Sequence, residues 1–182
     1  ALFVVARPRT LAKGITSEAT HVESPREWFI AFYDSSFWKF LTQPATLIAL
    51  SFVTYWGIYF SPVFEWLMSG HWGHVGMQIY LLTYGYALMW TVLGIDSDQS
   101  EVSIKQIYVL LATEPIHIIF GVVLLVSHRV IGESLYQILD VPYLTSLAND
   151  QQLGGIITLV IGEFINLGIL TWLVRRKAKA AA

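Results

Sequence analysis

Four long apolar runs, separated by polar segments, dominate the pattern of hydrophobic and polar positions along this chain. Each run is close to the roughly 20 residues that a helix needs to cross the hydrocarbon core of a bilayer. The pattern therefore predicts an all-α membrane bundle with four full spans, at about residues 44–59, 72–95, 104–127 and 153–174. Ser61-Pro62 is expected to end or kink the first helix, and Pro115 to kink the third.

The residues before the first span are of a different kind. Residues 1–6 are apolar and are followed by Arg7-Pro8-Arg9. A signal peptide carries its positive charge before the apolar part, so we interpret residues 1–6 as the truncated end of a helix that begins upstream. Residues 7–26 predict a loop. Residues 27–42 mix aromatic and charged positions, which favours an amphipathic helix in the membrane interface.

The basic residues predict how the bundle lies in the membrane. They gather on the cytoplasmic side of membrane proteins, and ten of the eleven lie on one side if both chain ends are cytoplasmic, with Arg129 as the exception. This orientation puts the start of the second span and the loop at residues 128–152, with a short helix near 134–139, on the outer side. We expect two parts, a cytoplasmic and interfacial segment over residues 1–43 and a four-span bundle with a basic tail over 44–182.

The composition agrees with an integral membrane protein. Hydrophobic residues make up 55% of the 182 positions and charged residues 13%, against about 25% charged residues in an average soluble domain. The net charge of −2 gives no reason to expect nucleic-acid binding. The absence of cysteine excludes disulfides and thiolate metal sites. No catalytic triad or nucleophile motif is present, so we expect that the protein is not an enzyme.

Soft metal ligands occur together at the start of the second span. Helical spacing puts His71 and His74 near one line, with Met77 on its flank. Cu⁺ prefers thioether, thiolate and imidazole ligands, and only histidine and methionine offer such groups in this chain. The spacing therefore predicts copper ligands at His71, His74 and Met77, with the two histidines on the outer side.

Ionisable residues also lie deeper in the predicted bundle. Glu114 and His117 fall on one face of the third span, and Glu163 lies near the middle of the fourth, after Asp150. Such residues are costly in a bilayer and usually mark a site. We expect His117 to be a metal ligand, and Glu114, Asp150 and Glu163 to orient imidazoles or carry protons. At 1.5 Å per residue His74 and His117 differ in height by ~10 Å, which favours two successive stations. Asp150 belongs to the outer group with His71 and His74, and Met77 to the inner group with Glu114, His117 and Glu163.

Several motifs occur along nearly the whole chain in the order of a known family: Ser61-Pro62-Val63-Phe64-Glu65-Trp66, Pro115-Ile116-His117 with Gly121, and Asp150-Gln151-Gln152-Leu153-Gly154-Gly155 followed by Gly162-Glu163. Together they resemble the caa3-type cytochrome c oxidase assembly factor family, known as CtaG. The resemblance implies a multi-pass protein of the bacterial plasma membrane that handles copper for haem–copper oxidase assembly. It implies membrane lipid and oxidase subunits as partners, and histidine-rich spans upstream, either in the same chain or separate.

The same family resemblance implies that this chain is a divergent member. Many members carry histidine where this chain has Gln78 and Tyr80, and methionine where it has Glu114. Two other functions therefore remain open. A non-catalytic accessory or scaffold subunit of a larger respiratory complex would explain the lost soft ligands. A b-type haem protein would use His74 and His117 as axial ligands, although their difference in height opposes binding to one iron.

Overall fold

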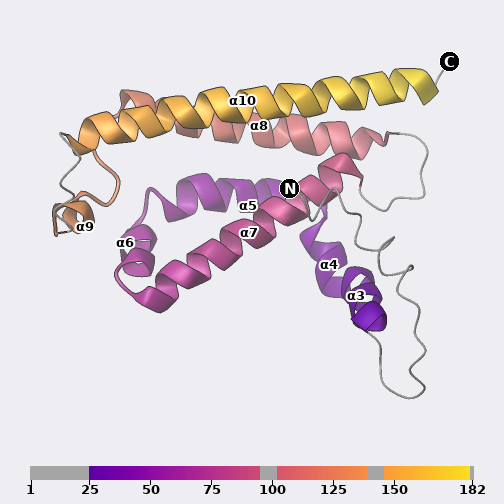
Figure 1. Ribbon diagram of the computed structural model, residues 1–182, viewed down its shortest axis with the longest axis horizontal. Helices are drawn as coiled ribbons and strands as arrows, with labels where there is room; N and C mark the ends of the chain where they lie inside the picture. Colours follow the sequence, from indigo (N-terminus) through magenta and orange to yellow (C-terminus); the bar gives the residue numbers. More distant parts are fainter. Residues whose placement is uncertain (1–24, 95–101, 139–145, 181–182) are drawn as a thin grey trace.

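The structure, a computed structural model, describes residues 25–94, 102–138 and 146–180. Every regular element in these residues is a helix, as the sequence predicts. The two longest, α8 (Ile104–Val126) and α10 (Leu147–Ala180), run antiparallel and side by side along one face of the molecule (Figure 1). The helix end expected at residues 1–6 lies outside the described residues.

The first predicted span is a continuous helix with a π-helical end. α5 (Pro44–Phe52) continues directly into η1 (Val53–Ile58). Ser61 then caps α6 (Pro62–Met68) by accepting the N–H of Val63 at 3.3 Å, and the axis bends by 81° between the two helices. The Ser61-Pro62 pair ends the first helix, as predicted, because the proline ring cannot continue the preceding helix and the serine oxygen starts a new one.

Two described helices, α8 and α10, are long and apolar enough to cross a membrane. The bent pair formed by α5–η1 and α6 makes a third if it counts as one span. The second predicted span forms α7 (His71–Leu93), which has 23 residues but carries polar tyrosine, threonine and glutamine side chains that lower its hydropathy. Of the four full spans predicted from the sequence, the described part of the chain therefore supports two or three.

The boundaries of the fourth predicted span were too narrow. α10 begins at Leu147, inside the expected loop, and continues past residue 174. Asp150 lies in its first turn, and Lys177 and Lys179 lie in its last. At these ends a negative and a positive charge, respectively, interact favourably with the helix dipole and stabilise the helix. The polar residues at both ends thus extend the helix beyond its apolar stretch. The loop that remains contains the short helix α9 (Glu133–Ile138), near the predicted position.

The amphipathic segment before the first span forms two helices instead of one. α3 (Pro25–Asp34) and α4 (Ser36–Leu41) are separated at Ser35, whose hydroxyl caps α4 by accepting the N–H of Trp38 at 3.1 Å. The ring of Tyr33 stacks on that of Trp90 in α7, with 4.5 Å between the centroids. Tyr33 thus packs the segment on the bundle, while five aromatic side chains of the segment are exposed: Trp28, Phe29, Phe32, Phe37 and Phe40.

Hydroxyl groups join α5 and η1 to α7. Tyr84 Oη lies 2.5 Å from Ser51 Oγ, and Tyr80 Oη lies 2.9 Å from Thr54 Oγ1. Ser51 donates its own proton to the carbonyl of Leu47 at 2.9 Å, so Tyr84 is the donor to Ser51. Such bonds hold membrane helices together, because lipid offers polar groups no other partner.

Removal of the Tyr84 hydroxyl tests this helix contact. We expect Tyr84→Phe to lower the free energy of unfolding by about 0.6–1.7 kcal/mol, the range known for hydrogen bonds between membrane helices. Unfolding of the purified protein in detergent measures the change. Tyr108→Phe is the matched control, since Tyr108 is 56% exposed. An equal loss in both variants would contradict the prediction.

Candidate metal centre

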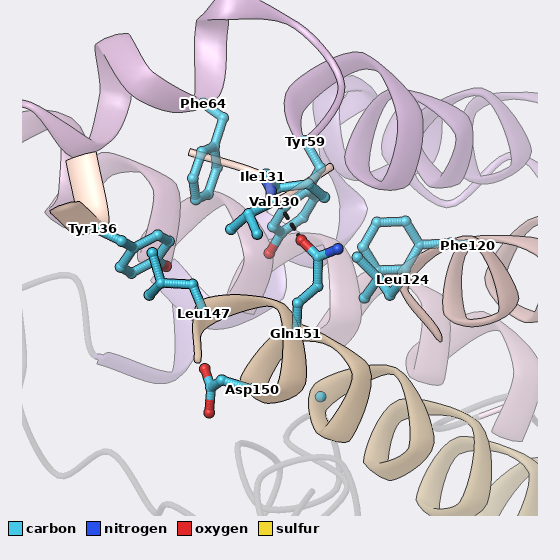
Figure 2. A pocket seen from close by; sticks show the side chains of 11 residues that line it. Tyr59, Phe64, Phe120, Leu124, Val130, Ile131, Tyr136, Leu147, Asp150 and Gln151 are labelled. Atoms are coloured by element: carbon cyan, nitrogen blue, oxygen red, sulfur yellow. Dashed lines mark hydrogen bonds between the residues drawn. The ribbon is translucent and has the colours of Figure 1, made fainter. Parts of the chain in front are cut away.

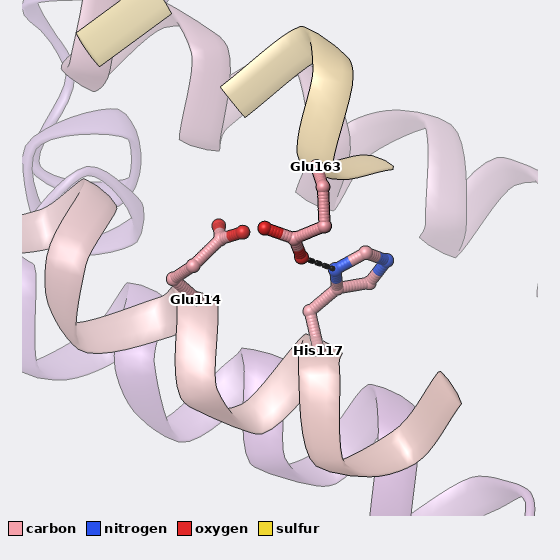
Figure 3. Close-up of side chains that lie close together, drawn as sticks. All are labelled: Glu114, His117 and Glu163. Carbon is pink, nitrogen blue, oxygen red and sulfur yellow. Dashed lines mark ion pairs between the residues drawn. The ribbon is translucent and has the colours of Figure 1, made fainter. Parts of the chain in front are cut away.

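Three ionisable side chains meet between the two longest helices, near the middle of each. Glu114 and His117 are about one turn apart on α8 and so share a face of that helix. Glu163 of α10 points toward them (Figure 3). One ligand atom from each residue lies within 4.8 Å of the others. The structure therefore brings together three of the residues that the sequence placed in an inner group.

Contacts from both helices hold the cluster. Nδ1 of His117 lies 3.8 Å from Oε1 of Glu163, which is ion-pair range but too long for a hydrogen bond. Nδ2 of Asn166, one turn after Glu163 on α10, donates to Oε2 of Glu114 at 2.5 Å. Asn166 thus fixes one oxygen of Glu114 and leaves the other free to face the cluster.

One polar atom of each cluster residue is buried without a hydrogen-bond partner: Glu114 Oε1, His117 Nδ1 and Glu163 Oε1. Leaving such an atom unsatisfied costs about 1–3 kcal/mol, and two carboxylates that face each other also repel. A cation between the three residues would remove all of these penalties. Imidazole and carboxylate ligands suit Zn²⁺ and Cu²⁺, so the donor set fits a divalent transition metal.

A cavity of about 210 Å³ adjoins the cluster. Glu114 and His117 line it from α8, and Tyr55 lines it from η1. The ring centroid of Tyr55 lies 5.6 Å from that of His117. π-helical turns are frequent at functional sites, and this one directs an aromatic wall toward the cluster. The cavity is large enough to hold several waters, or a further ligand, beside the three side chains.

Gly162 allows the imidazole of His117 to lie directly on the backbone of α10. A Cβ at position 162 would overlap Cε1 of His117 and would come within 2.9 Å of its Nε2. Any larger residue would therefore push the imidazole away from Glu163, the next residue along the helix. The Gly162-Glu163 pair supplies both the space for the imidazole and its charged neighbour.

The ligands predicted at the start of the second span lie at the N-terminal end of α7. His71 and His74 are exposed there. Met77 is 7% exposed and belongs to a hydrophobic core between η1, α6 and α7, so its side chain is not beside His74. The sulfur nearest to that histidine is Met68 Sδ, which lies 3.3 Å from His74 Nδ1.

Asp150 lies apart from both groups of ligands. It is exposed at the edge of a separate pocket of about 200 Å³, which Figure 2 shows with its largely aromatic and aliphatic lining. The neighbouring Gln151 fastens the segment after α8 to α10. Its Oε1 accepts the N–H of Ile131 at 2.8 Å, and its Nε2 donates to the carbonyl of Arg129 at 3.0 Å.

Sequence reasoning missed three residues of these sites: Asn166, Tyr55 and Met68. Asn166 had a signal, because it is a polar residue one turn after Glu163 in an apolar helix, where polar side chains usually contact another helix. Tyr55 and Met68 had no comparable signal. Their positions depend on the π-helical turn and on the bend before α6.

Candidate membrane spans and a partly buried cluster of carboxylates and imidazole define a helical membrane protein with a candidate metal centre. Residues 1–180 match the cytochrome c oxidase caa3 assembly factor family, Caa3_CtaG. The chain belongs to this family, which confirms the resemblance in its motifs.

Relatives of the chain occur in mycobacteria. It is 35% identical over 159 residues to an uncharacterized protein of Mycobacterium leprae, covering 86% of this chain and 24% of the relative. It is 31% identical over 181 residues to an uncharacterized protein of Mycobacterium tuberculosis, covering 98% of this chain and 27% of the relative. The chain thus spans about a quarter of the length of these relatives. No solved structure matches it.

Substitution of Gly162 tests the close contact with His117. In an open helical position, Gly→Ala stabilises a protein by roughly 0.5–1 kcal/mol. We expect Gly162→Ala instead to lower the free energy of unfolding by about 1–3 kcal/mol, the usual cost of overpacking. Thermal unfolding in detergent measures the difference. Gly168→Ala is the control on the same helix, because a Cβ there meets nothing within 4 Å. A more stable Gly162→Ala variant would argue against the contact.

Proposed function

We propose that this protein is a non-catalytic membrane factor that handles copper during assembly of a haem–copper cytochrome c oxidase. One observation carries the proposal: a chain of the oxidase assembly factor family brings Glu114, His117 and Glu163 together between two helices, each with one buried polar atom that lacks a hydrogen bond. Copper is the cargo here rather than a resident cofactor, so a site with only three side-chain ligands suits both binding and release.

We divide the proposed ligands between two copper-binding stations. His74, with His71 one turn before it, would hold copper at the exposed end of α7. His117, with Glu114 and Glu163, would hold it in the middle of the bundle. Copper would pass between stations and to the oxidase by ligand exchange. Met77 would reach a metal only by leaving the core in which it packs. Asp150 would act at the edge of the separate pocket that it lines.

We place four spans in the bacterial plasma membrane, with both chain ends in the cytoplasm. α7 would be the fourth span, since 23 residues at 1.5 Å per residue reach about 35 Å. Two of its polar groups, the hydroxyls of Tyr84 and Tyr80, bond to Ser51 of α5 and Thr54 of η1. The basic tail of α10 and the start of α8 lie at one end of the bundle, and α6 and α9 at the other (Figure 1). This arrangement supports the topology derived from the basic residues.

Copper content of the purified protein tests the proposed function. We expect His117→Ala and Glu163→Gln to weaken copper binding by more than the roughly 10–100-fold that loss of an outer-shell partner costs. His74→Ala should remove the copper held at the outer station. Metal analysis after purification from copper-supplied cells gives the copper per chain.

Two exposed residues provide matched controls: His128→Ala and Glu133→Gln should keep the copper of the wild type. Full retention of copper in both His74→Ala and His117→Ala would refute the proposal. Stoichiometric co-purification with an oxidase, without any metal, would favour the scaffold alternative. A Soret band in the absorption spectrum would favour the haem alternative.

A further inference from the structure

The turn between α6 and α7 holds a thioether against an imidazole. Met68 is the last residue of α6, and His74 lies in the first turn of α7. Between them, Sδ of Met68 lies 3.3 Å from Nδ1 of His74. His74 is exposed and Met68 is partly exposed, so the two donor atoms are accessible from outside the bundle.

Local packing fixes the two side chains in this position. Gly73 lies so close to the carbonyl of Leu67 that a Cβ at position 73 would overlap the oxygen, which brings the first turn of α7 onto the end of α6. Met68 packs on the same hydrophobic core that contains Met77. The stem of Met68 is therefore anchored while its sulfur faces His74. Met77, in contrast, packs in the core.

A third side chain controls which imidazole nitrogen is free. Nε2 of Gln78, one turn after His74 on α7, lies 3.0 Å from Nε2 of His74. When the amide donates to Nε2, the ring proton is on Nδ1 and points at the sulfur. If the amide turns over, its oxygen accepts a proton on Nε2, and the lone pair of Nδ1 then faces Met68. Ligating histidines commonly use their second nitrogen in this way.

We propose that Met68 and His74 form a Cu⁺ site at the exposed end of the bundle, with Gln78 as the positioning residue. Thioether sulfur and neutral imidazole are soft ligands that select Cu⁺ over Zn²⁺. On binding, the ring proton moves from Nδ1 to Nε2, so no proton leaves the protein. The exposed side of His74 stays open for the donor that brings or removes the ion.

The proposal rests on the proposed copper-handling function and names the chemistry of its outer station. That station differs from the inner cluster, where two carboxylates and an imidazole form a harder donor set. Met68 takes the place that the sequence pattern gave to Met77. Substitution of Met68 can therefore be compared directly with substitution of Met77, because both residues contact the same hydrophobic core and only Met68 faces a histidine.

The test uses Met68→Leu and Met77→Leu, which both conserve volume. The full chain in detergent is titrated with Cu⁺ under anaerobic conditions, in competition with a chromophoric Cu⁺ chelator. We expect Met68→Leu to lower the Cu⁺ affinity of the outer station at least about tenfold, since loss of an outer-shell partner alone costs roughly that much. Gln78→Leu should lower the same affinity by about 10–100-fold. Met77→Leu should bind Cu⁺ as the wild type does, and Zn²⁺ affinity should be the same in both methionine variants.

X-ray absorption of the Cu⁺-loaded wild type supplies a readout that needs no variant. A sulfur neighbour at bonding distance supports the proposal, and its absence overturns it. Unchanged Cu⁺ affinity in Met68→Leu, or an equal loss in Met77→Leu, also overturns it. If Met68→Leu is neutral while His117→Ala still loses copper, this proposal fails and the copper-handling function stands. A wild-type chain that binds no copper overturns both.

Discussion

The close approach of α8 and α10 is the contact on which the rest of the structure depends. A Cβ at Gly121 would lie 2.7 Å from the side chain of Leu159, and one at Gly155 would lie 3.0 Å from the carbonyl of Gly121. Helices in lipid associate through this kind of packing at small residues, because the hydrophobic effect gives them no reason to leave the lipid. The short separation also brings the side chains of α8 within reach of Glu163. The glycines that join the two helices therefore also assemble the polar cluster.

The two helix interfaces of the bundle use polar groups in opposite ways. Between α5 and α7, Ser51 and Tyr84 satisfy each other by hydrogen bonding, so the polar groups add stability and specify the pairing. Between α8 and α10, the cluster keeps buried atoms without partners. Low polarity strengthens a satisfied bond and raises the cost of an unsatisfied group. Intramembrane carboxylates that carry this cost are characteristic of ion sites, which is why the second interface is the candidate metal centre.

Gln78 and Tyr80 of α7 both make structural contacts. Tyr80 bonds to Thr54 and so links α7 to η1, and Gln78 contacts the imidazole of His74. The candidate ligands differ in chemistry along the bundle. Thioether and imidazole lie at the exposed end, and carboxylates with imidazole lie in the middle. Such a difference would serve the proposed copper handling, because donors of unlike softness favour different oxidation states of the ion.

The sequence by itself determined the all-α class, the candidate membrane spans, the family and the grouping of Glu114, His117 and Glu163. Apolar runs near 20 residues and costly intramembrane charges such as Glu163 are strong local signals, and Glu114 and His117 share a face by helical spacing alone. Only the tertiary structure decided which donors meet. The bend after Ile58 and the close turn at Gly73 place Met68 beside His74, while Met77 turns into the core. Helical periodicity gives the direction of a side chain within one helix, but the partner across a turn or an interface depends on how the helices pack.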